Sequence, residues 1–175
     1  MREVSDDFLL NMAEVSSALV GLFLVGVFFY VETGFRRTVY AREVVEPYFR
    51  ASTVIVLVLF AIPIMLSLAL VVLEPVWSRV LFGVLSLTLV AANVDTAVRM
   101  RSVERVTHST IMLANEALGT VSVVVLVTLP WILGGPEPSR EDLTWAILIS
   151  FAAGFLSVCT IVISAFDLSR SEASD

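Results

Sequence analysis

Five long apolar stretches alternate with short polar segments along the chain. They cover residues 8–31, 49–73, 77–98, 111–133 and 143–166. Each is roughly 22–25 residues long, and a helix of that length, at about 1.5 Å per residue, crosses a hydrocarbon core of about 30 Å with some tilt. The pattern predicts an all-α, polytopic integral membrane protein: one transmembrane domain over residues 1–175, folded as a five-helix bundle.

The polar segments differ in charge, and this difference predicts the orientation of the helices. Cytoplasmic segments of membrane proteins are enriched in basic residues. The first and third connections and the C-terminal tail carry eight arginines, and the opposite side carries three. The eight are Arg36, Arg37, Arg42, Arg50, Arg99, Arg101, Arg105 and Arg170, and the three are Arg2, Arg79 and Arg140. We therefore expect the N-terminus outside and the C-terminus in the cytoplasm.

The aromatic residues sort in agreement with this topology. Both Trp and Tyr favour the two membrane interfaces. Trp77, Trp131 and Trp145 map to the outer boundary, and Tyr30, Tyr40 and Tyr48 map to the inner one. A miscounted helix would scramble this sorting.

Composition supports the membrane assignment and narrows the classes of function. Apolar residues make up 58% of the chain, above the roughly 45–50% of soluble domains. A net charge of −6 without a basic patch argues against nucleic-acid binding, which depends on clustered Lys and Arg. All eleven basic residues are Arg, which is typical of a high-GC or salt-adapted genome, and we expect a prokaryotic plasma membrane.

The segments around the first stretch carry two further expectations. Residues 1–7 are acidic, unlike the positive start of a signal peptide, so the first stretch should remain as a span. Residues 36–45 are predicted to form a short amphipathic turn on the inner membrane surface. Pro47 is then expected near the first turn of the second helix, where its missing N–H costs little.

Three acidic residues, Glu14, Asp95 and Glu116, lie inside the predicted spans. A carboxylate at the bilayer centre costs about 2.5–3.5 kcal/mol, so such residues usually face a bundle interior or a wet cavity and are candidates for function. Asp95 has Arg99 as an i,i+4 partner, which favours an interfacial ion pair.

Glu14 belongs to a polar stripe of the first helix, formed with Asn11, Ser17 and Gly21 at spacings of three and four residues. This stripe could line a pathway for ions or protons. Ser17 and Gly21 also form a small-xxx-small pair, which allows two helices to approach closely while Asn11 and Glu14 hydrogen-bond across the contact. Both interpretations remain open.

A second polar group is expected between the third and fourth helices. Both helices carry polar residues near the inner end: Asn93, Asp95, Asn115 and Glu116. Such a cluster could bind a cation or relay protons, and a purely structural hydrogen-bonded network is the alternative.

The fifth helix has a seam of mostly small residues, which predicts close helix contact inside the bundle or against another subunit. The seam consists of Ala146, Ser150, Gly154, Ser157, Ile161 and Ser164. Pro63, deep in the second helix, should kink it by removing one backbone hydrogen bond, as a hinge or as a fixed bend.

Catalytic and cofactor signatures are absent from the sequence. It contains no G-x-S-x-G, H-E-x-x-H or phosphate-binding loop, and no His pair for haem. Cys159 is the single cysteine and His108 the single histidine, and neither has neighbours at ligand spacing. We expect no enzyme activity, no cofactor and no metal site.

Two functions from different classes remain. The first is a homo-oligomeric cation or proton channel or transporter that uses the intramembrane carboxylates, with Glu14 at the outer mouth and Asp95 with Glu116 at the inner one. The second is a non-catalytic scaffold or accessory subunit of a larger membrane complex. In either case the expected partners are the lipid bilayer and other copies or membrane subunits.

Overall fold

The computed structural model describes the backbone of residues 4–34, 39–107 and 110–171, and the side chains of residues 4–29, 51–98 and 117–160. The described chain is all-helical. Its helices are α1 (Asp6–Gly34), α2 (Val39–Val72), α3 (Pro75–Thr107), α4 (Thr110–Gly134) and α5 (Arg140–Ser171). All five are long and apolar enough to cross a membrane, and they fit a multi-pass membrane protein.

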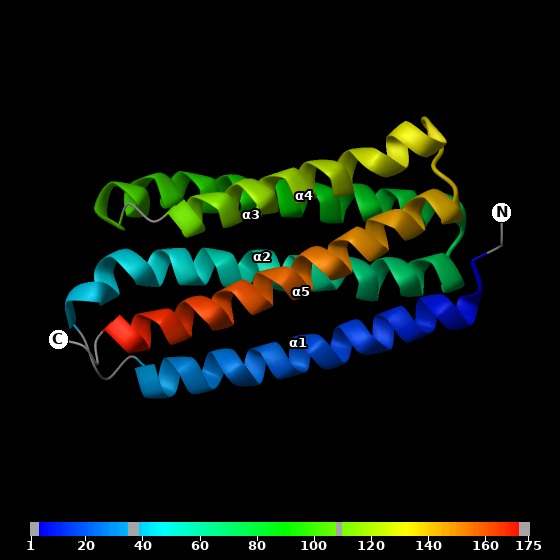
Figure 1. The fold of residues 1–175 in the computed structure, drawn as a ribbon. Coiled ribbons are helices and arrows are strands. Elements are labelled where there is room, and N and C mark those ends of the chain that lie inside the picture. Colours follow the sequence, from blue (N-terminus) through cyan, green and yellow to red (C-terminus); the bar gives the residue numbers. More distant parts are fainter. Residues whose placement is uncertain (1–3, 35–38, 108–109, 172–175) are drawn as a thin grey trace.

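The helices run up and down along one bundle axis (Figure 1). Helices α1, α3 and α5 begin at the end that holds the N-terminus, and α2 and α4 finish there. We call this the N-terminal end and the opposite one the C-terminal end. Helix α2 is central, because it packs against α1, α3 and α5, whereas α4 contacts α5 and, less extensively, α3.

Three helices extend well beyond the predicted apolar stretches. Helix α2 begins at Val39, α3 continues to Thr107 and α5 to Ser171. The predicted separate turn is therefore wrong for residues 39–45, which belong to α2, and Pro47 lies inside α2 rather than in its first turn. Hydropathy marks where a helix is apolar, whereas a helix continues into polar sequence until a residue or a turn ends it.

The centre of the described bundle is filled by apolar side chains. A long cluster joins all five helices, including Leu9 of α1, Leu66 of α2, Phe82 of α3, Leu126 of α4 and Ile147 of α5. A smaller one, formed by Phe23, Val56 and Phe60, holds α1 against α2. The Phe60 ring also meets that of Phe151 edge-on, with centroids 6.3 Å apart.

Two tight connections set the geometry of the N-terminal end. Pro75 is the first residue of α3, where its fixed φ favours a helix and its missing N–H is no loss. The carbonyl of Glu74 accepts from the Trp77 N–H at 3.0 Å. After α4, Gly135 has φ of 62°, the left-handed conformation that ends helices and that glycine adopts without strain.

All three tryptophans lie near the N-terminal end with exposed side chains. Trp77 lies in the first turn of α3, Trp131 near the end of α4 and Trp145 near the start of α5. The alternating directions of the helices thus bring these residues to the same level, as the five-span pattern requires.

Candidate functional site

The polar stripe of α1 lies on the outside of the described bundle. Asn11, Glu14 and Ser17 are exposed, and a Cβ added at Gly21 would have nothing within 4 Å. The Ser17 hydroxyl donates to the carbonyl of Ala13, in its own helix, at 2.8 Å. The stripe is therefore open to another molecule and does not face the core of this chain.

A different set of α1 residues faces the core. Leu9, Ala13, Ser16 and Phe23 are buried, on the side that packs against α2. Ser16 and Ser17 are neighbours in the sequence but point to different sides of the helix, since successive residues are about 100° apart. Ser17 belongs to the predicted polar stripe, whereas the buried hydroxyl is that of Ser16.

About midway along the bundle, a side-chain hydrogen bond joins α3 and α4. The Asn93 side-chain amide donates to the hydroxyl of Thr120 at 3.4 Å. Thr120 is not a member of the predicted cluster. Asp95 is exposed, and the buried side chain next to it is Thr96. The side chains of Asn115 and Glu116, predicted members of the same cluster, lie outside the described residues.

The small-residue seam of α5 packs within the chain, against α2. Gly154 is buried, and a Cβ added there would lie 3.2 Å from the Phe60 ring and 3.4 Å from the Cβ of Leu59. Ser150 is fully buried and contacts the same turn of α2, whereas Ser157 is half-buried. The Ser164 side chain is outside the described residues. Among these positions, Ser150 and Gly154 serve an internal contact.

Pro63 lies at this crossing and is fully buried. A proline has no N–H, so the carbonyl four residues earlier, that of Leu59, loses its helical donor. The hydroxyl of Ser150 donates to this Leu59 carbonyl at 2.5 Å. The predicted kink residue and the predicted seam thus belong to one arrangement, in which α5 supplies the hydrogen bond that α2 lacks.

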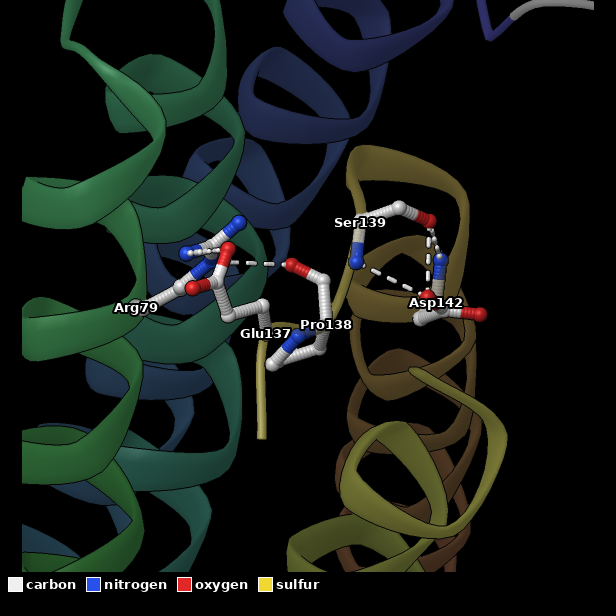
Figure 2. Close-up of polar contacts among 5 residues, drawn as sticks. All are labelled: Arg79, Glu137, Pro138, Ser139 and Asp142. Carbon is white, nitrogen blue, oxygen red and sulfur yellow. Dashed lines mark hydrogen bonds and ion pairs between the residues drawn. The ribbon is translucent and has the colours of Figure 1, made fainter. Parts of the chain in front are cut away.

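Charged residues at the N-terminal end connect helices that are far apart in the sequence. Figure 2 shows Arg79 of α3 reaching the segment before α5, where its Nε donates to the Pro138 carbonyl at 3.1 Å and its Nη1 pairs with Glu137 at 3.3 Å. Arg140, at the start of α5, forms an ion pair with Asp6 at the start of α1. In the sequence, both arginines indicate only the orientation of the chain.

A reciprocal cap begins α5 (Figure 2). The Asp142 carboxylate accepts from the backbone N–H of Ser139 at 2.8 Å and from its hydroxyl at 2.7 Å, and the Asp142 N–H donates back to that hydroxyl at 3.3 Å. This is the capping-box arrangement, with Asp as the acidic member. The Ser-x-x-Asp spacing is a signal that sequence reasoning could have used.

Several buried hydroxyls lack a hydrogen-bond partner. They belong to Ser16 of α1, Ser67 of α2, and Ser78 and Ser86 of α3. The Nε of Arg140 is also buried without a hydrogen-bond partner. Buried polar groups are normally paired. Of these, Ser78 and Arg140 line the same small cavity.

Within residues 4–29, 51–98 and 117–160, no three His, Cys, Asp or Glu side chains come together as ligands for a metal ion. Cys159 is a half-buried free thiol, and His108 lies outside the described residues. The arrangement thus offers an exposed carboxylate on α1, an amide-hydroxyl contact between α3 and α4, and a charged network at the N-terminal end. Comparison with protein-family models, curated proteins and solved structures found no match to this chain.

Proposed function

We propose that the chain is the subunit of a homo-oligomeric membrane protein through which cations or protons cross, with Glu14 facing the passage. The observation that supports this is the exposure of Glu14 on α1, together with Asn11 and Ser17. An acidic side chain within a membrane span is costly when it faces lipid. A second copy of the chain, packed against the stripe, would shield its polar side chains from lipid.

The packing of the core also favours a passage between subunits. Phe60, Phe82, Leu66 and Leu126 are fully or almost fully buried and fill the space that a pathway inside a single chain would need. Five helices form too thin a bundle to enclose a wide channel, so several subunits around an axis are the simpler arrangement. A ring of Glu14 carboxylates around that axis would favour cations over anions.

The orientation proposed from the arginines places this ring near the outer mouth, with the N-terminus outside and the C-terminus in the cytoplasm. Asn93 and Asp95 of α3 then lie towards the cytoplasmic side. Glu116, on α4, is the further residue proposed for the inner mouth. The proposed location is a prokaryotic plasma membrane.

Proteoliposomes containing the purified protein test this function. An imposed gradient of H⁺, Na⁺ or K⁺ is expected to drive flux through the wild type. Glu14→Gln should remove most of this flux, because it keeps size and hydrogen bonding but removes the charge. Glu74→Gln is the matched control, since Glu74 is exposed in the turn between α2 and α3 and is not part of α1, and its flux should equal that of the wild type. Wild-type vesicles without flux of any of the three ions would contradict the proposal.

A second candidate is a non-catalytic scaffold or accessory subunit, and the Ser17 hydrogen bond favours it. The Ser17 hydroxyl is engaged with its own helix and Gly21 leaves open space, which suits close packing against a helix of another protein. On this alternative the chain co-purifies with a different membrane protein in mild detergent. Glu14→Gln would then weaken that association, and no vesicle would show flux.

A further inference from the structure

A cavity of about 180 Å³ lies at the N-terminal end, where α2 meets the beginning of α3 and the entry to α5. Its walls are mainly apolar and come from Leu70, Leu73, Leu143 and two prolines. The volume is well above the roughly 10–15 Å³ that a single water requires. The cavity can hold a chemical group of several atoms, but not a whole lipid.

Two polar residues, Ser78 and Arg140, complete the lining. Ser78 is 0% exposed and its hydroxyl has no hydrogen-bond partner. The Arg140 Nε is also enclosed and without a partner, while the Nη2 of the same guanidinium pairs with Asp6. Both enclosed groups are donors. An unpaired buried donor costs about 1–3 kcal/mol. A ligand that brings a hydrogen-bond acceptor into the cavity would remove this cost.

The two helix N-termini beside the cavity and the Arg140 guanidinium in its lining suit an acceptor that is an anion. Helices α3 and α5 both begin beside the cavity, and the first turn of a helix carries a partial positive charge. Three of the six described carboxylates at this end are already engaged, those of Asp6 with Arg140, Glu137 with Arg79 and Asp142 with Ser139. The other three, those of Asp7, Glu74 and Glu141, are not part of the cavity lining. The Nε of Arg140 and the hydroxyl of Ser78 stay available.

We propose that this cavity binds the phosphate group of a membrane lipid. The phosphate oxygens accept from the Ser78 hydroxyl and from the Arg140 Nε, and the lipid atoms next to the phosphate pack against Leu70, Leu73 and Leu143. The apolar walls favour a lipid over free phosphate, because the carbon atoms attached to a lipid phosphate can pack against them, whereas free phosphate has no apolar atoms. The inference rests on the membrane placement proposed above, but not on ion conduction.

Lipid titration of the purified protein followed by native mass spectrometry tests the proposal. The probe is phosphatidylglycerol, added to protein that has been stripped of lipid in detergent. The wild type should bind a first lipid molecule with defined affinity. Ser78→Ala removes one donor with little change in volume and should weaken this binding about tenfold, and Arg140→Gln should weaken it further, since charge-assisted hydrogen bonds are the stronger ones.

Asp6→Asn is the matched control. It removes the ion pair of Arg140 and leaves the Nε and Ser78 in place, so lipid affinity should be kept or increased. Equal affinities of the wild type, Ser78→Ala and Arg140→Gln would overturn the proposal. A second measurement uses inorganic phosphate alone: a rise in melting temperature that depends on Ser78, without any lipid adduct, would overturn the assignment to a lipid.

Discussion

The hydroxyl of Ser150 in α5 donates a hydrogen bond of 2.5 Å to the carbonyl of Leu59 in α2. This carbonyl is the one that Pro63 leaves without a helical donor. In an apolar surrounding an unpaired carbonyl is costly, and neighbouring helices and Ser or Thr side chains commonly satisfy it in membrane helices. The contact therefore holds α2 against α5 beside Pro63, and it favours a fixed position of this part of α2 over a hinge.

Replacing Ser150 should be costly only while Pro63 is present. Ser150→Ala removes the donor to Leu59, and we expect a loss of about 1 kcal/mol of stability, the size typical of hydrogen bonds between membrane helices. Pro63→Ala restores a backbone N–H to the same carbonyl. In that background the additional effect of Ser150→Ala should be much smaller, and thermal unfolding of the four proteins in detergent measures the difference. Equal effects in both backgrounds would show that the hydroxyl acts elsewhere.

Enlarging Gly154 should damage the chain itself. A Cβ at this position lies 3.2 Å from the Phe60 ring, so Gly154→Ala requires a small shift of that ring, and Gly154→Leu requires α2 and α5 to separate. We expect a modest fall in melting temperature for Ala and a loss of about 1–3 kcal/mol or more for Leu. Gly26→Leu, at a site with nothing within 4 Å, is the control and should melt like the wild type.

Gly134 is expected to be intolerant of any side chain, although it lies at a surface turn. An added Cβ would clash with a carboxylate oxygen of Asp142 and would lie 3.1 Å from the Cβ of Pro138. Gly134→Ala should therefore displace Asp142 and weaken the cap of α5, at a cost of about 1 kcal/mol. Gly119→Ala, in an open part of α4, should be neutral or slightly stabilising. Circular dichroism during heating compares the two, and equal melting curves would argue against the steric explanation.

The exposed stripe of α1 should lie at a contact between copies of the chain. In a Cys159→Ser background, Ser17→Cys should form a disulfide-linked dimer in native membranes after mild oxidation, because helices that meet at small residues approach closely enough for this bond. Gly26→Cys, exposed elsewhere on α1, should give far less dimer. Non-reducing gel electrophoresis provides the measurement. Equal yields from both positions would point to random collisions and argue against a specific interface.

The extent of the helices could be predicted only in part. The apolar stretches located all five, because a helix that crosses lipid must be apolar over a fixed length. They did not locate the start of α2 at Val39 or the end of α3 at Thr107. Those ends lie in polar sequence, where hydropathy carries no signal.

The buried face of α1 was also beyond reach of the sequence. In a soluble protein a buried face is apolar and an exposed face is polar, so periodicity separates them. Around α1 the residues are apolar on nearly every side, with exposed Leu22, Val25 and Phe28 and buried Leu9 and Phe23. The polar stripe of Glu14 could be recognised by its spacing, but its direction away from the core could not.

The order of apolar and polar segments, and the places of Pro63, the α5 seam and the tryptophans, follow from the sequence alone, because each depends on local residue type and spacing. The tertiary structure decided which groups meet: Ser150 with Leu59, Arg79 with Pro138, and Arg140 with Asp6, which is 134 positions away. Such pairs depend on how the helices cross and rotate about their axes. Residue spacing within one helix does not specify either quantity.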